Sequence, residues 1–272
     1  MRRDRRWKWI LGVFGTLGLI LGAFIWWLPW DLTLSPTKPG LRRPDLLTFD
    51  QLSQGNPRIL VITAHPDDSE FYMAGTLLRL NQASAELRLV VATNGDKGFY
   101  PFSDPAPLAR TRQAEQTAIA KLWGAKDVIF LGFPDGRLHN GDELENAIKK
   151  QIEDFRPDTI LTLESEHHRR ASHSDHRRVG ETVAKVGPTC PGVKSILFAE
   201  TGERDLVVDI SDLLERKFEL LRMHKSQFED LGKGRKDFVA RIIRDDAEAA
   251  GKLIGVKYGE GFRVVLIPSA SK

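Results

Sequence analysis

The sequence predicts an α/β fold of the Rossmann-like type: an open, mostly parallel sheet with helices on both faces, preceded by one transmembrane helix. From residue 58 onward, short apolar runs rich in β-branched residues alternate with stretches of helical period. Continuous apolar runs separated by helices are typical of parallel strands buried on both faces. Crossovers between such strands are right-handed, which produces a doubly wound sheet. A charge-free apolar run precedes all of these segments near the N-terminus.

The first element is a predicted membrane anchor. No charged residue lies between Trp9 and Trp30, and about 20 apolar residues, each adding roughly 1.5 Å of helix, cross a hydrocarbon core of about 30 Å. Five of the six tryptophans flank this run, where indole rings favour the headgroup region. A cleaved signal peptide is the alternative, but the run is too long for one and no small-residue cleavage site follows it. Residues 1–30 are therefore predicted to be a basic tail and an uncleaved transmembrane helix.

The tail also predicts how the anchor is oriented. Residues 2–8 contain five basic residues and one acidic residue, and the positive-inside rule keeps such a cluster in the cytoplasm. We expect a single-pass membrane protein whose main domain lies on the extracytoplasmic side. Residues 31–57, with Pro36, Pro39 and Pro44 and little periodicity, are predicted to link the anchor to a domain of residues 58–272.

The elements of this domain follow from the length and period of its apolar segments. We expect strands at Arg58–Thr63, Leu87–Thr93, Val128–Leu131, Thr159–Leu163, Ser195–Phe198, Leu206–Ile210 and Phe262–Ile267. We expect helices at Met73–Asn81, Leu108–Trp123, Glu143–Phe155, Val179–Val186, Ser211–Gln227 and Lys236–Leu253, with Ser211 as an N-cap. In such sheets ligands bind outside the carboxyl ends of the strands.

Charge and cysteine content exclude several classes of partner. The formal net charge of +3 arises in the N-terminal tail, and the rest of the chain is close to neutral. A nucleic-acid-binding surface needs a clustered basic face, so no nucleic acid is expected. The Gly-rich residues 93–98 lack the spacing of a nucleotide-binding loop, so no nucleotide is expected either. The single cysteine, Cys190, excludes an internal disulfide and a thiolate zinc cluster. The oligomeric state stays open.

A cluster of acids and a histidine, Ala64–Glu70, directly follows the first predicted strand. Its three acidic groups repel one another unless a positive charge lies among them, and a divalent cation supplies one. Pro66 restricts the local backbone, which helps to aim His65 and Asp68 at one point. A turn with a helix cap is the alternative, since aspartate and proline favour turns.

A second cluster, the HSDH sequence of residues 173–176, follows the fourth predicted strand. If a helix starts at Ser174 or Asp175, the imidazoles of His173 and His176 can approach the same point. Together the two clusters form a site of two histidines and one carboxylate, with a position left open for water as catalytic zinc requires. Non-haem iron uses a similar set, so Fe2+ remains an alternative to Zn2+.

Seven segments in order resemble one known family. They are AHPDDSE (64–70), TNGDKG (93–98), RQAE (112–115), FLGFPDGRL (130–138), HSDH (173–176), HKSQ (224–227) and YGEGFR (258–263). The sequence thereby resembles the PIG-L (LmbE-like) deacetylases, zinc-dependent enzymes that remove acetyl from N-acetylglucosamine units. The resemblance covers most of residues 58–267, and its first and fifth segments are the most specific.

The resemblance implies a role for each matching polar residue. The implied metal ligands are His65, Asp68 and His176; Asp67 is the general base and His173 assists the tetrahedral intermediate and the leaving group. Arg112 and Asp135 fall where the family places substrate-binding residues. Asp175 is expected to orient an imidazole, and Glu70 is expected to support the site without binding the metal.

These roles predict a hydrolase that removes acetyl from an N-acetylglucosamine-type amino sugar, with lipid or glycan linkage left open. A deacylase of a soluble amino-sugar conjugate is one alternative, and a catalytically silent, membrane-tethered sugar-binding protein is another. The basic run of residues 167–170 departs from the pattern of many relatives and borders the expected pocket. It fits either a solvated loop or a phosphate on the substrate.

Overall fold

The structure is a computed structural model that describes residues 30–31, 43, 45–98, 104–166, 172–231 and 237–268. Across these residues no helix is both long and apolar enough to cross a membrane. The predicted anchor lies outside the described residues except for Trp30, and the basic run of residues 167–170 lies outside them entirely.

A seven-stranded sheet forms the centre of the domain, with strand order β4-β3-β2-β5-β7-β9-β8. The first five strands in this order are parallel, and β9 alone runs in the opposite direction, antiparallel to β7 on one side and to β8 on the other. The strands are β2 (Arg58–Thr63), β3 (Glu86–Thr93), β4 (Ala125–Phe133), β5 (Thr159–Leu163), β7 (Ser195–Ala199), β8 (Leu206–Asp209) and β9 (Gly259–Leu266). The predicted mostly parallel α/β sheet is confirmed.

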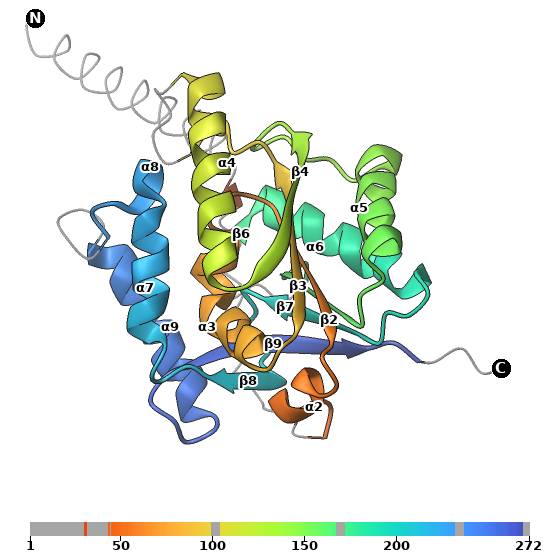
Figure 1. Ribbon diagram of the computed structural model, residues 1–272, viewed down its shortest axis with the longest axis vertical. Coiled ribbons are helices and arrows are strands. Elements are labelled where there is room, and N and C mark those ends of the chain that lie inside the picture. Colours follow the sequence, from red (N-terminus) through yellow and green to blue (C-terminus); the bar gives the residue numbers. More distant parts are fainter. Residues whose placement is uncertain are drawn as a thin grey trace, which may run out of the picture.

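Helices cover both faces of this sheet. Figure 1 shows α5 and α6 on one side and α3, α4 and α7 on the other. The helices are α2 (Phe49–Ser53), α3 (Asp68–Gln82), α4 (Pro105–Leu122), α5 (Asp142–Phe155), α6 (Ser174–Val186), α7 (Leu214–Met223), α8 (Lys225–Phe228) and α9 (Asp237–Lys252), with a 3-10 turn at Gly187–Thr189. Strands β2, β3 and β5 are almost entirely buried, as apolar central strands covered on two faces should be.

Two short elements lie before the predicted domain. Helix α2 lies within the segment predicted as a linker, and a capping box between Thr48 and Gln51 starts it. Strand β1 (Trp30–Asp31) pairs antiparallel with β6 (Ser172–His173), so that Trp30 is opposite His173. The chain at the end of the predicted anchor therefore lies beside the HSDH segment.

The prediction of one helix from Ser211 to Gln227 is wrong in two respects. Ser211 is not the N-cap, because its hydroxyl donates to Asp209 Oδ1 at 2.6 Å and the helix begins at Leu214. The helix also stops before His224, whose ψ of 67° leaves the helical range and separates α7 from α8. The His224 ring is buried against Glu70, a tertiary contact that helical periodicity does not show.

Just after β5, a buried ion pair anchors the chain that leads toward the HSDH segment. Glu164 is fully buried and accepts hydrogen bonds from Arg263 Nε and Nη2, each at 2.8 Å. Burial alone would raise the pKa of Glu164, but the hydrogen bonds and charge of Arg263 lower it to about 2. Because this pKa lies below the unfolded value of about 4.3, the carboxylate stabilises the fold above that pH. The stabilisation is lost as the pH falls toward 2.

We therefore expect Glu164→Gln to lower the free energy of unfolding at pH 7 by about 2–3 kcal/mol, because Arg263 then keeps a buried charge without a carboxylate. Near pH 3 the difference should shrink, since the carboxyl is then protonated in the unfolded state and unfolding takes up a proton. Urea unfolding of the wild type and the variant at pH 7 and pH 3 measures the difference in the free energy of unfolding. Asp154→Asn, which breaks the exposed Lys150–Asp154 pair, is the control and should change stability by less than about 1 kcal/mol. A Glu164→Gln effect of the same size at both pH values would contradict this expectation.

Candidate active site

The candidate residues converge at the carboxyl ends of the parallel strands. His65 follows β2, Asp68 begins α3, and His176 lies in the first turn of α6. Asp135 comes from the loop after β4, and Glu200 directly follows β7. The sheet thereby gathers at one edge side chains that lie far apart in the chain, as expected for an open α/β sheet.

Three potential ligand groups surround one point. His65 Nδ1 lies 3.2 Å from His176 Nε2, which in turn lies 3.2 Å from Asp68 Oδ1. Asp68 Oδ2 lies 3.6 Å from His65 Nδ1. Tetrahedral zinc with bonds of 2.0–2.1 Å separates its ligand atoms by about 3.3 Å. The three predicted ligands therefore approach one another in pairs, with different Asp68 oxygens facing the two rings. Within the described residues, the groups whose ligand atoms all lie within 4.8 Å of one another are His65–His173–His176 and His65–Asp135–Asp175.

Two carboxylates orient the ring of His65. Its Nε2 lies 3.2 Å from both Asp135 Oδ1 and Asp175 Oδ2. Asp175 is itself held by the backbone N–H groups of Gly136 at 2.6 Å and Leu138 at 3.2 Å. A proton on Nε2 facing these acids leaves the Nδ1 lone pair directed at the shared point, the usual arrangement for a metal-binding histidine.

His176 is oriented in the same way by a residue that the sequence analysis missed. Glu200 Oε2 lies 2.8 Å from His176 Nδ1, and Glu200 Oε1 accepts a hydrogen bond from the Tyr72 hydroxyl at 3.1 Å. The only signal in the sequence is that Glu200 directly follows an apolar strand, a position shared by many surface acids.

Backbone groups direct the Asp68 carboxylate. Its Oδ2 accepts from the N–H groups of Ala64 at 3.0 Å and His65 at 2.7 Å. Its Oδ1 stays directed at His176. One oxygen is thus satisfied by the turn, and the other is available to a cation.

The site carries more negative charge than its side chains balance. Burial opposes a proton on His176, yet Asp68 and Glu200 raise its pKa to about 10. Burial likewise opposes a proton on His65, but Asp135 leads a group of carboxylates that raises its pKa well above the usual value. A field that favours positive charge on both rings would equally stabilise a divalent cation between them.

His173 lies beside these ligands as the N-cap of α6. Its Nδ1 accepts from the Asp175 N–H at 3.2 Å, and its ring centroid is 4.5 Å from that of His65. A ring nitrogen of His173 also comes within 4.8 Å of ligand atoms of His65 and His176, so a three-histidine set is geometrically close as well. Burial, and then the charges of His65 and His176, lower the pKa of His173 to about 3. The ring is therefore neutral, and with Nδ1 accepting, its proton lies on Nε2.

Asp67 lies next to the ligand group and is clamped by Arg112. Arg112 Nη2 lies 3.1 Å from Asp67 Oδ2, and Nη1 lies 3.4 Å from Asp135 Oδ2. Arg112 also donates to the carbonyls of Pro66 and Gly95, which fixes its guanidinium between the two turns. Burial raises the pKa of Asp67 despite the opposing charge of Arg112. The substrate-binding roles predicted for Arg112 and Asp135 stay predictions.

Glu70 is not among the converging groups. It is fully buried and accepts from Trp123 Nε1 at 2.6 Å and from the amide of Gln116, and it contacts His224 Nε2 at 2.9 Å. These contacts place Glu70 in a buried polar network that contains none of the predicted metal ligands.

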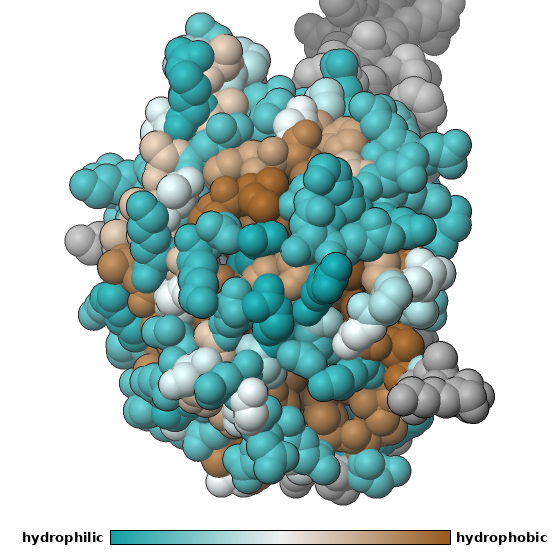
Figure 2. All heavy atoms as spheres, turned by 45° about the vertical axis from the view of Figure 1, so that its right-hand side comes forward, coloured by the Kyte–Doolittle hydropathy of each residue, from teal (hydrophilic) through white to brown (hydrophobic). Residues whose placement is uncertain are grey.

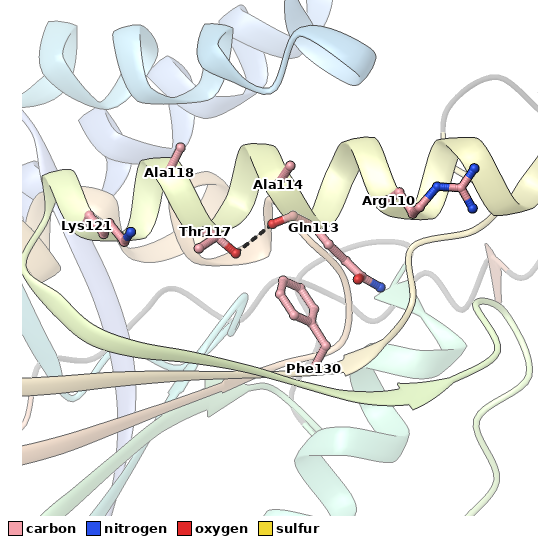
Figure 3. Close-up of a pocket in the computed structure, with 7 residues that line it drawn as sticks. All are labelled: Arg110, Gln113, Ala114, Thr117, Ala118, Lys121 and Phe130. Atoms are coloured by element: carbon pink, nitrogen blue, oxygen red, sulfur yellow. Dashed lines mark hydrogen bonds between the residues drawn. The ribbon is translucent and has the colours of Figure 1, made fainter.

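The surface offers a hollow away from these residues. A cavity of about 550 Å³ lies between α4 and β4, and Figure 3 shows Phe130 beneath side chains of α4 such as Gln113 and Thr117. None of the candidate site residues lines it. The face in Figure 2 is mostly hydrophilic, with hydrophobic side chains in separate areas. The candidate site therefore rests on its donor atoms and not on this hollow.

Known proteins match the chain over the same region. A family model described as PIG-L, GlcNAc-PI de-N-acetylase, matches residues 60–186. A probable N-acetyl-alpha-D-glucosaminyl L-malate deacetylase 2 from Bacillus anthracis is 29% identical over 186 residues, 62% of this chain and 81% of that protein. The uncharacterized deacetylase YaiS of Escherichia coli is 32% identical over 150 residues, 52% of this chain and 75% of that protein.

A solved structure extends the likeness to the fold. The N,N'-diacetylchitobiose deacetylase from Pyrococcus horikoshii is 29% identical, with a TM-score of 0.69 over 80% of this chain and 90% of that one. These relatives carry the names of deacetylases, most of them of N-acetylated amino sugars. The seven segments, the fold and the matches agree, and the chain belongs to the PIG-L family.

Proposed function

We propose that the protein is a zinc-dependent N-deacetylase that hydrolyses the acetamide of an N-acetylglucosamine-type amino sugar, releasing acetate and a free amine. The observation that carries this proposal is the close approach of His65, Asp68 and His176 to one another, with a carboxylate, Asp67, beside them. A sugar-binding protein would not need this buried cluster of imidazole and carboxylate groups. The names of the relatives support the substrate class.

His65, Asp68 and His176 would hold the ion, and zinc in such a site acidifies water and polarises the acetyl carbonyl. Asp67 takes the proton of the attacking water on its carboxylate. Its side chain is 14% exposed, more than that of Asp68 at 6%, so it is the more accessible of the two carboxylates.

His173 completes the mechanism as a donor. Its Nε2–H can bond the oxygen on which negative charge develops, where a preorganised donor contributes about 2.7–4 kcal/mol. The proton that Asp67 has taken then moves to the departing amine. Arg112 keeps the Asp67 carboxylate oriented through both steps.

We also propose that the substrate is presented at a membrane surface, with the domain on the extracytoplasmic side. The pairing of Trp30 with His173 supports this, since the end of the predicted anchor then lies beside a residue of the site. A lipid-linked sugar fits this location best. A soluble amino-sugar conjugate is the second candidate.

Acetate release from a small panel of substrates tests the proposal. The full-length protein in detergent should release acetate from at least one of GlcNAc-inositol, a GlcNAc-lipid and a chito-oligosaccharide. A preference for the lipid would support the membrane substrate, and equal rates would favour a soluble one. Chelation should abolish the activity, and adding back Zn2+ or Fe2+ in turn identifies the metal. Release of acetate that persists after complete removal of metal would contradict the proposed chemistry.

A further inference from the structure

The backbone of Asp67 adopts a conformation that needs external support. Its φ of 106° lies in the left-handed region, which side chains other than glycine rarely adopt. Such a conformation is strained and persists only where the surroundings hold it. The contacts of Asp67 therefore decide whether the proposed base stays in place.

Helix α4 holds Asp67 from two sides. Gln116 Oε1 accepts the Asp67 N–H at 2.7 Å, and Arg112, one turn earlier, binds the carboxylate. Residues four apart share one helical face, so a single face of α4 fixes both the backbone and the side chain. Gln116 is fully buried and does not touch the three metal-binding groups in the described contacts.

Glu70 determines which way the Gln116 amide points. Gln116 Nε2 lies 3.2 and 3.1 Å from the two carboxylate oxygens of Glu70. The backbone N–H of Asp67 can only donate, so the amide turns its oxygen toward Asp67 and its NH2 toward the Glu70 oxygens, which accept. Trp123 and His224 occupy the remaining sides of the Glu70 carboxylate. The network thus allows one orientation of the amide.

We propose that Gln116, oriented by Glu70, is a positioning residue for the proposed base: it holds the left-handed turn that places the Asp67 carboxylate beside the ligand group. The inference rests on the proposed function of Asp67. The buried network around Glu70, which contains none of the proposed metal ligands, would thereby affect the rate of the reaction.

Gln116→Met tests this, because methionine keeps the length and volume of the side chain and removes the acceptor. We expect kcat to fall about 10- to 100-fold, the usual result of misplacing a reacting group, while KM and zinc content stay near the wild-type values. The Asp67 N–H should also lose protection, so hydrogen–deuterium exchange of a peptide spanning residues 64–71 should become faster. This second readout does not depend on catalysis.

Lys217→Met is the matched control. Lys217 pairs at 2.7 Å with Glu260, both are buried, and Glu260 accepts from the Gly75 and Thr76 N–H groups further along α3. Lys217→Met should lower the melting temperature without a selective loss of kcat or faster exchange at residues 64–71. If Gln116→Met does not fold, Gln116→Asn keeps the amide but shortens it, and should reproduce the kcat loss in milder form.

Unchanged exchange at residues 64–71 in Gln116→Met would overturn the proposal, as would loss of zinc or an equal kcat loss in Lys217→Met. If the wild-type protein releases no acetate from any substrate, the proposed function fails instead. The exchange measurement would then still decide whether Gln116 holds Asp67.

Discussion

Asp67→Asn should retain zinc and lose about 100- to 10,000-fold in kcat, the range that a positioned general base contributes. Asparagine has nearly the shape of aspartate and can still accept from Arg112, so the turn at residue 67 should survive. What it cannot do is take a proton from water. The measurement pairs acetate release at saturating substrate with elemental analysis of the same sample.

The control for this experiment is Asp104→Asn. Asp104 is an exposed N-cap of α4 that accepts the Ala106 N–H, and its replacement also removes one negative charge. It should leave kcat close to wild type. If Asp67→Asn keeps most of its activity with zinc bound, Asp67 is not the base, and another carboxylate near His65 must accept the proton.

His176→Ala should have the second large effect, through the metal and not through proton transfer. The substitution removes Nε2 from the three converging ligand atoms and leaves Asp68 and Glu200 without the ring that separates them. With only His65 and Asp68 left, the site should hold zinc poorly. The purified protein should therefore contain little metal and release no acetate. Inductively coupled plasma analysis measures the metal directly.

His139→Ala is the matched control, since His139 is exposed in the loop before α5. It should keep zinc and activity at wild-type levels. Zinc retained at one ion per chain in His176→Ala would remove His176 from the ligand set. The neighbouring ring of His173 would then be the first candidate to replace it.

Local patterns were sufficient to predict the framework of the domain. The apolar runs that became β2, β5 and β7 are short, continuous and buried, so their period and length identify them without tertiary information. Helix α2 was missed because its signal is a five-residue segment with a capping box, too short to show a period. The position of β9 between β7 and β8 depends on pairing across 50 residues or more, which no local pattern contains.

In the candidate site, too, some residues could be predicted from local sequence and others only from contacts across the fold. The AHPDDSE and HSDH segments are unusual enough in composition to be found from the sequence. Glu200 and Gln116 could not be found in this way, because nothing in their local sequence is unusual and their roles depend on contacts with residues distant in the chain. The structure places Glu200 against His176 and Gln116 against Asp67, and neither contact could be read from spacing.

The separation of the converging ligands along the chain has a consequence for how metal and folding are linked. His65 and Asp68 are three residues apart, but His176 lies more than a hundred residues later. Closing a loop of that length is an entropic cost that only the completed sheet offsets. Unfolded chains and fragments should therefore not bind the ion at this site, and an ion that binds the native state alone stabilises it by mass action. Saturating zinc should accordingly raise the unfolding temperature of the whole domain, and metal uptake during refolding should report the final assembly of the sheet.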